Sequence, residues 1–290
     1  MMSLVIRETE NKNALHCLSI SNDDIELLVT IDRGPEIIDF RKKGKDCLFL
    51  EDANNSSPQG HSIWLVSEQD QNFHCASAPV MYTPLENGVH FMQRVNTSLP
   101  LEVGLDIMIT PEFSDVMIIH SLTNKSDQAV KLSIHTETKF KPQGFIFVPQ
   151  SNVRTENAPS RILTLWPDCK WGDSRLFLGN QYVTVSHSPH LKSKLKIGSN
   201  NTAGWSGYIN GENAFIKRYI HNRNALYPFY GSSTYAYADH DCLSIQTASP
   251  FYIIEPSETA RHVENWTLPH TLCSCNPRND FSIDDFINSL

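Results

Sequence analysis

Alternation of apolar and other residues along short stretches is the feature that most limits the fold of this sequence. Every second residue from Leu101 to Ile109 is apolar, and similar stretches recur along the chain between clusters of turn residues. Side chains of an extended strand point alternately to the two faces of a sheet, so this pattern is typical of strands with one buried face. No long stretch shows helical periodicity. The sequence therefore predicts an all-β protein.

The predicted strands are short and numerous. We expect about fifteen of them, joined by turn clusters such as Asp32–Pro35 and Thr123–Asp127, with no parallel-sheet crossovers. Without a repeat of propeller-blade length, this favours a large antiparallel β-sandwich that forms a single domain over residues 1–290. Only Phe281–Leu290 is predicted to be helical.

Charge and composition exclude several classes of partner. The net charge is −8 at pH 7, and nucleic-acid binding needs clustered Lys and Arg, so we expect no nucleic-acid partner and no membrane partner. No export signal or transmembrane run is visible. The seven cysteines are scattered without a C-x-x-C pair, and Cys273 and Cys275 are predicted to be thiols in a tail. We therefore expect a cytoplasmic, reducing location, and no cofactor or metal, since the histidines lack metal-ligand spacing.

The stretch Gly60–Glu68 combines an imidazole (His61), an indole (Trp64) and a carboxylate (Glu68) within nine residues. The apolar face of a pyranose stacks on an aromatic ring while its hydroxyls need donors and acceptors at the rim, so the stretch is suited to a sugar pocket. A core tryptophan beside a hydrogen-bonded histidine explains it equally well.

A second polar row lies in the predicted strand Ala129–Phe140. Lys131, Ser133, His135, Glu137 and Lys139 share one face of it. A solvated sheet face is the ordinary explanation of such a row. The functional alternative is a concave face whose side chains reach into a cleft.

Five blocks of the sequence, taken in order, resemble one known family. They are Gly60–Glu68, Trp166–Arg175, Phe215–Arg218, Tyr227–Gly231 and Glu264–Leu268. Their order resembles that of the galactose mutarotase-like β-supersandwich proteins, in particular a branch related to the aldose 1-epimerases, from about Ile25 to Leu268. The resemblance implies a supersandwich with a sugar cleft and anomer interconversion by acid and base catalysis.

The sequence departs from the family pattern at several positions. The arginine expected in the first block is Ser62, and an acidic residue expected after Tyr227-Pro228 is Phe229. The strand that carries the family's catalytic glutamate resembles Leu243–Thr247, where the counterpart is Gln246. An amide cannot take a proton, although it can hold a sugar hydroxyl. The usual mechanism is then lost unless Glu68, Glu137 or Glu264 replaces the missing carboxylate.

Together these observations predict a carbohydrate-handling protein, either an aldose 1-epimerase-like isomerase or a degenerate relative that binds sugar without catalysis. Its partner would be a small-molecule sugar or sugar derivative. The expected catalytic residues are His135, His61 and Glu68, and the expected substrate-binding residues are Trp64, Asp173, Arg175, Lys217 and Gln246. Asp173 and Arg175 could equally form a surface pair, and Lys217 could be solvated on an edge strand. The alternatives are a protein-interaction module and, less favoured, a glycoside hydrolase.

Overall fold

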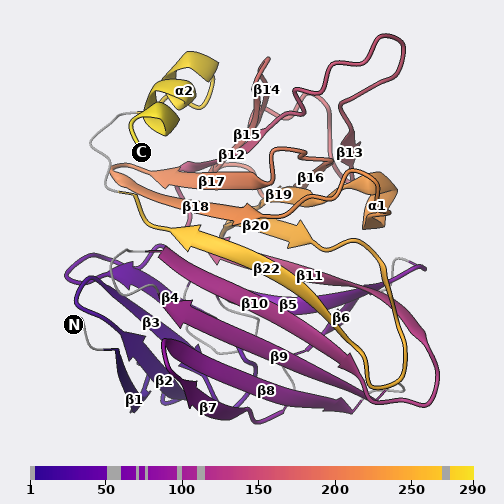
Figure 1. The fold of residues 1–290 in the computed structure, drawn as a ribbon. Coiled ribbons are helices and arrows are strands. Elements are labelled where there is room, and N and C mark those ends of the chain that lie inside the picture. Colours follow the sequence, from indigo (N-terminus) through magenta and orange to yellow (C-terminus); the bar gives the residue numbers. More distant parts are fainter. Residues whose placement is uncertain are drawn as a thin grey trace.

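Two antiparallel β-sheets pack face to face in the computed structural model, which describes residues 4–50, 60–69, 72–75, 78–96, 100–109, 115–269 and 275–290 (Figure 1). The sandwich predicted from the alternating pattern is confirmed. Each sheet combines strands that are far apart in the sequence, as the mixed colours of neighbouring strands in Figure 1 show. Residues from distant parts of the chain therefore meet on one sheet face.

Among the described residues, the first sheet, sheet A, contains twelve strands. Ten of them lie in the order β1 (Val5–Glu10), β2 (His16–Ser21), β3 (Ile25–Thr30), β4 (Ile37–Lys42), β5 (His61–Ser67), β11 (Val130–Phe140), β20 (Leu243–Ala248), β19 (Thr234–Ala238), β16 (Leu195–Ser199) and β13 (Leu163–Leu165). The short strands β6 (Asn72–His74) and β21 (Tyr252–Ile254) pair with β5 and β11 respectively.

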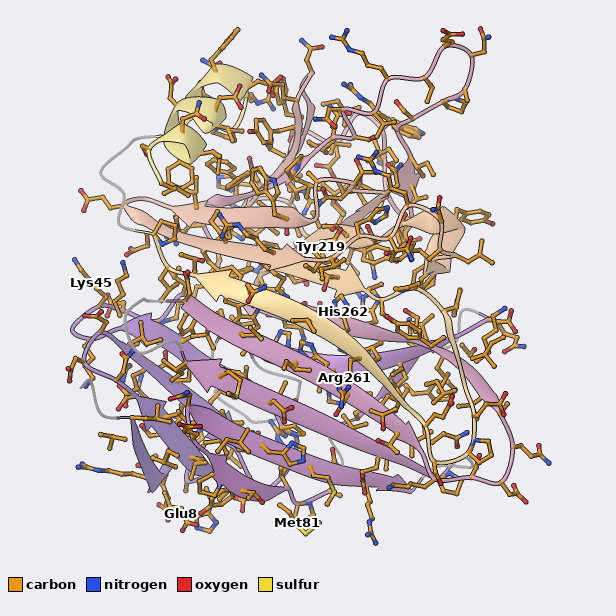
Figure 2. The ribbon with its side chains drawn as sticks, viewed as in Figure 1. Glu8, Lys45, Met81, Tyr219, Arg261 and His262 are labelled. Carbon is orange, nitrogen blue, oxygen red and sulfur yellow. The ribbon has the colours of Figure 1, made fainter. Side chains whose placement is uncertain are left out.

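The second sheet, sheet B, contains ten strands in the part of the chain that the structure describes. Their order is β14 (Leu176–Leu178), β15 (Tyr182–Ser186), β12 (Phe145–Pro149), β17 (Trp205–Asn210), β18 (Asn213–Tyr219), β22 (Thr259–Thr267), β10 (Asp115–Asn124), β9 (Pro100–Ile109), β8 (Gly88–Asn96) and β7 (Met81–Leu85). Figure 2 labels Tyr219 and His262 on the neighbouring strands β18 and β22, and their rings lie 6.0 Å apart.

The main hydrophobic core fills the space between the two sheets. Phe40 of sheet A lies 5.8 Å from Trp266 of sheet B, measured between ring centroids, and Phe49 lies 5.8 Å from Phe215. All four side chains are fully buried. Burying a large apolar side chain stabilises a fold by about 1.5–3 kcal/mol, so these contacts hold the sheets together.

The predicted C-terminal helix is present as α2 (Asp280–Asn288). The side chain of Asn279 accepts a hydrogen bond from the backbone N–H of Phe281 and so caps the helix. Ile283 and Phe286 are buried against Phe147 and other residues of sheet B, on the side away from sheet A. The Sγ of Cys275 donates to the carbonyl of Ser282, while Cys273 lies outside the described residues.

Most of the expected strands are present, but some elements differ from the prediction. Cys47–Leu50 forms only an isolated bridge, in which Phe49 pairs with Phe140. A helical segment that was not predicted, α1 (Pro228–Gly231), precedes α2 in the chain. It is a single turn in which Phe229 and Tyr230 have positive φ angles of 49° and 62°. Among the described residues, no helix is both long and apolar enough to cross a membrane.

Candidate functional site

Three neighbouring strands of sheet A, β5, β11 and β20, form the centre of the candidate site. His135 of β11 lies directly opposite Trp64 of β5, and Glu137 of β11 lies directly opposite Gln246 of β20. Residues that face each other across antiparallel strands point to the same side, as do residues two apart on one strand. The four side chains therefore share the face of sheet A that points away from sheet B.

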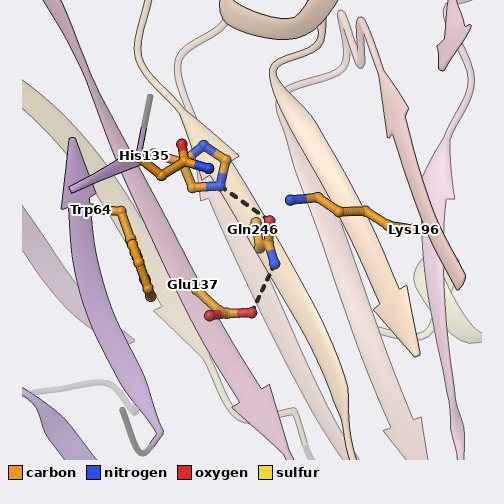
Figure 3. Close-up of a pocket in the computed structure, with 6 residues that line it drawn as sticks. Trp64, His135, Glu137, Lys196 and Gln246 are labelled. Carbon is orange, nitrogen blue, oxygen red and sulfur yellow. Dashed lines mark hydrogen bonds between the residues drawn. The ribbon is translucent and has the colours of Figure 1, made fainter. Parts of the chain in front are cut away.

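A pocket of about 170 Å³ opens on this face. The described residues that line it are Trp64, Asn72, His135, Glu137, Lys196 and Gln246. Figure 3 shows the indole of Trp64 and the ammonium group of Lys196 on opposite sides of the row formed by the other labelled residues. The pocket is smaller than the roughly 300–1,000 Å³ typical of drug-sized ligands, so it is suited to a ligand the size of a monosaccharide.

The polar row of β11 is not solvated along its middle. Ser133, His135 and Glu137 are 0%, 5% and 8% exposed. The solvated-face explanation is therefore wrong for these three residues, because side chains from β20 and the neighbouring segments cover them. Only Lys131 and Lys139, near the ends of the row, are partly exposed.

A chain of hydrogen bonds runs through the pocket from Glu137 to His135 (Figure 3). The Gln246 Nε2 donates to Glu137 Oε1 over 2.7 Å, and Ser244 Oγ donates to the same oxygen over 2.9 Å. The amide oxygen of Gln246 then accepts from His135 Nε2 over 3.1 Å. The carboxylate accepts only, so it fixes the orientation of the Gln246 amide, and the amide fixes the imidazole tautomer.

This network leaves His135 as a neutral imidazole with its proton on Nε2. Burial, followed by the positive charge of Lys196, lowers the pKa of His135 to about 3. Its Nδ1 is buried and has no hydrogen-bond partner among the described residues. The Nδ1 lone pair can therefore accept a hydrogen bond, but the ring is not an imidazolium acid at neutral pH.

Lys196 lies inside a collar of aromatic rings. Its Nζ is 4.6 Å from the ring centroid of Trp166, 5.3 Å from that of Tyr235 and 5.9 Å from that of Phe229. Burial lowers the pKa of Lys196, and the charge of Glu137 opposes that shift. The rings stabilise a cation through their π faces.

Trp64 is half-buried at the other side of the pocket. Its Nε1 donates to Ser62 Oγ over 3.2 Å, and its ring centroid lies 4.5 Å from that of His74 on β6. These contacts hold the indole in one orientation. The arrangement provides the aromatic plate that the sequence predicted.

Several predicted site residues lie outside this pocket. The Glu68 carboxylate is exposed and accepts from Lys131 Nζ over 2.6 Å, beyond the end of β5. Asp173 and Arg175 form a bidentate pair with donor–acceptor distances of 3.0 and 2.8 Å. The Arg175 guanidinium is buried and also donates to the carbonyl of Ala238, so this pair joins a loop to the end of β19.

His61 and Lys217 lie between the two sheets instead. Lys217 Nζ is 3.1 Å from Glu264, and both side chains are fully buried. Burial opposes ionisation of Glu264, but the charge of Lys217 and the neighbouring histidines together outweigh it and hold the pKa of Glu264 well below its usual value. Thr136 and Thr247 also donate to Glu264 Oε1, over 2.6 and 2.5 Å. This cluster is a hydrogen-bonded inter-sheet network with no place in the pocket.

The ring nitrogens of His61 and His120 and a carboxylate oxygen of Glu264 lie within 4.8 Å of one another, which makes them the metal candidates among the described residues. The ring-nitrogen lone pairs of His61 and His120 already accept hydrogen bonds. His120 Nδ1 donates to the carbonyl of His262, so its Nε2 accepts from His61 Nε2, and His61 Nδ1 accepts from Thr138 Oγ1. The ammonium group of Lys217 against Glu264 would also repel a cation. These residues do not fit a metal ion.

Four residues of the pocket and its rim, Glu137, Lys196, Asn72 and Trp166, are not among the expected catalytic and substrate-binding residues, although Glu137 was named as a replacement carboxylate. Glu137 carried a usable signal, because it is two residues from His135 on one strand and shares its face. Lys196 and Asn72 carried none, because β16 and β6 are short strands without a clear alternating pattern, whereas Trp166 belongs to one of the five blocks that resemble the family.

Comparison of the whole fold with solved structures gives consistent matches. A galactose mutarotase-like protein from Clostridium acetobutylicum matches with a TM-score of 0.61 at 9% identity, over 92% of this chain and 99% of that one. One from Lactobacillus casei matches with a TM-score of 0.58 at 10% identity, over 87% and 100%. A candidate aldose 1-epimerase from Klebsiella pneumoniae matches with a TM-score of 0.61 at 12% identity, over 93% and 85%.

The chain has the galactose mutarotase-like fold. No family model matches the sequence, and no curated protein matches it. The agreement is therefore one of architecture, at identities of 9–12% in these three comparisons. The fold expected from the five sequence blocks is confirmed, while the chemistry of this protein depends on the residues of its own pocket.

Proposed function

We propose that this mutarotase-like protein binds a monosaccharide or a small sugar derivative in the pocket between Trp64 and Lys196. The observation that carries the proposal is the placement of an indole beside a row of hydrogen-bonding side chains in a pocket of about 170 Å³. The indole offers an apolar plate for one face of a sugar ring. Glu137, Gln246 and Asn72 offer donors and acceptors for its hydroxyls.

Within this proposal, binding is favoured over rapid anomer interconversion. Opening a pyranose ring needs a base for the C1 hydroxyl proton and an acid for the ring oxygen. Among the described side chains, the group within hydrogen-bond distance of His135 is the amide of Gln246, which cannot serve as that base. Glu137 is the carboxylate of the pocket, and two donors already occupy its Oε1. These features favour holding a sugar over reacting with it.

A titration followed by tryptophan fluorescence tests the proposal. Neutral aldoses and their phosphorylated and oxidised derivatives are added to the protein and to two variants. We expect saturable quenching with the unmodified protein and with Trp171→Ala, since Trp171 is 66% exposed and lies outside the pocket. The variant Trp64→Ala is expected to lose this saturable quenching. No saturable response to any ligand would contradict the proposal and favour the protein-interaction alternative.

Polarimetry separates binding from catalysis. Freshly dissolved α-anomers of the sugars that bind are followed with and without protein. We expect equilibration at the buffer rate, because an amide stands where a base is needed. A protein-dependent acceleration that disappears in Glu137→Gln would instead assign the proton transfer to Glu137.

A further inference from the structure

Lys196 is a cation that forms no ion pair with the described residues, although the charge of Glu137 acts on it from a longer distance. None of the described carboxylates lies within ion-pairing distance of its Nζ. Its Nζ lies over the three aromatic rings of the collar. Figure 3 shows its ammonium group directed toward Gln246, into the pocket. A buried or partly buried charge usually has a partner of opposite sign, so a missing one calls for an explanation.

The carboxylate of the pocket does not supply this partner. Glu137 Oε1 accepts from Ser244 and Gln246, and Glu137 Oε2 lies 3.9 Å from Lys139 Nζ. Its negative charge is therefore shared with Lys139 and two hydrogen-bond donors. The charge of Lys196 remains available to a ligand.

From these contacts we propose that the ligand carries an anionic group, a phosphate or a carboxylate, which lies against Lys196 while its ring stacks on Trp64. This inference rests on the proposed sugar-binding function and specifies the class of ligand. The aromatic collar limits the access of water to the ammonium group, so a charged acceptor gains more there than a neutral hydroxyl.

The overall charge of the protein does not favour an anionic ligand. A net charge of −8 repels small anions on average. A preference for an anionic ligand would therefore come from local contacts in the pocket. Lys196 is the pocket-lining residue among those described that can supply it without giving up an ion pair.

Isothermal titration calorimetry with matched ligands tests this inference. Glucose, glucose 6-phosphate and glucuronate form one set, and galactose, galactose 6-phosphate and galacturonate form a second. Inorganic phosphate is a fourth kind of probe, after the neutral, phosphorylated and oxidised sugars, and shows whether the anion binds without the ring. We expect at least one anionic member to bind about tenfold or more tightly than its neutral parent, a ratio within reach of one charge-assisted hydrogen bond. Comparison of the phosphorylated and the oxidised sugar in each set shows which anionic group binds more tightly.

Three variants assign the preference to Lys196. Lys196→Met keeps an unbranched apolar stem under the rings and is expected to reduce the anionic preference to less than about twofold. Lys196→Arg keeps the cation and is expected to retain the preference. Lys131→Met, which removes a partly exposed lysine paired with Glu68, is expected to leave it unchanged. Thermal melting of each variant shows that it is folded.

The outcomes separate this inference from the proposed function. Equal binding of neutral and anionic members, or a preference that survives in Lys196→Met, overturns the role of Lys196 but leaves sugar binding intact. If Lys196→Met does not fold, loss of the preference in Lys196→Arg overturns the same role. The absence of binding by any member of either set overturns both proposals.

Discussion

Gln246 accepts a hydrogen bond from His135 across 3.1 Å at the centre of the pocket, and its own amide donates to Glu137 across 2.7 Å. An amide can bridge an imidazole and a carboxylate because it carries both a donor and an acceptor. This bridge defines the protonation states on the pocket face of sheet A. It also makes Gln246 the position at which catalysis is most directly tested.

Gln246→Glu is expected to place a second carboxylate beside Glu137. Two carboxylates this close cannot both ionise freely, so one pKa rises above its unfolded value. The variant is then destabilised progressively as pH rises above about 4.3, because the folded state holds a proton that the unfolded chain releases. We expect its free energy of unfolding to lie roughly 1–3 kcal/mol below that of the unmodified protein at pH 7. This difference is expected to be smaller at pH 4.5.

Polarimetry of Gln246→Glu measures whether the missing carboxylate limits catalysis. We expect the variant to accelerate anomer equilibration above the buffer rate, because a base now stands beside His135. The exchanged pair Gln246→Glu with Glu137→Gln is the matched control, since it keeps one carboxylate and one amide. An inactive variant that still binds sugar would show that a base at this position is not sufficient.

Glu137→Gln is expected to weaken sugar binding by about tenfold, because it removes a charged acceptor and releases the orientation of the Gln246 amide. The control is Glu68→Gln, which changes an exposed carboxylate outside the pocket and is expected to shift the dissociation constant less than about twofold. Calorimetry with the best ligand compares the two. Equal effects at both positions would contradict the assignment of Glu137 to the site.

Stability is expected to fall in acid because of buried histidines. Burial lowers the pKa of His120 to about 4 and that of His135 to about 3. Both histidines take a proton near pH 6.5 when unfolded, so the unfolded state binds more protons below that pH. Each contribution is complete above about pH 6.5 and is lost as pH falls to about 4 for His120 and about 3 for His135, with a slope near 1.4 kcal/mol per pH unit per histidine.

Urea unfolding at pH 7.5, 6.5, 5.5 and 4.5 measures this dependence. His135→Gln is expected to have a smaller slope than the unmodified protein, because one of the histidines with a lowered pKa is gone. His16→Gln is a surface control, since the neighbouring Asp32 raises the pKa of His16 and the ring is exposed. A midpoint independent of pH would contradict the buried, neutral state of these rings.

The inter-sheet pair of Lys217 and Glu264 is expected to matter for stability and not for binding. Lys217→Met leaves Glu264 buried without its cation, and breaking such a pair costs about 3–5 kcal/mol. The double variant Lys217→Met with Glu264→Gln is expected to cost less than the sum of the single changes. A urea double-mutant cycle measures the coupling, and Lys131→Met at an exposed pair is expected to cost about 0–1 kcal/mol.

The fold could be predicted from the sequence because period-two alternation records which face of each strand is buried. The same rule placed Trp64 and His135 correctly on one face of sheet A. The same alternation places His61 on the inward-facing side of β5, because His61 is two residues from Ile63. A histidine on an apolar face is more often part of a core, and His61 lies there.

The rest of the site could not be predicted, because it depends on pairings between distant strands. Lys217 alternates with Phe215 and Tyr219, which places it on the core face, but only the pairing of β18 with β22 brings it to Glu264. Lys196 reaches the pocket because β16 pairs with β19 beside β20. Single-domain organisation over residues 1–290 and a cytoplasmic location stay predictions.

The proposed function requires a sugar ring to stack on the indole of Trp64. The most direct measurement is the ¹H–¹⁵N spectrum of the five tryptophan indole groups during titration with the best ligand. Trp64→Phe identifies the signal of Trp64. We expect a large, saturable shift of the Trp64 signal, while the signals of the Trp171 and Trp266 indoles do not change. Saturable binding that leaves the Trp64 signal unmoved would contradict it.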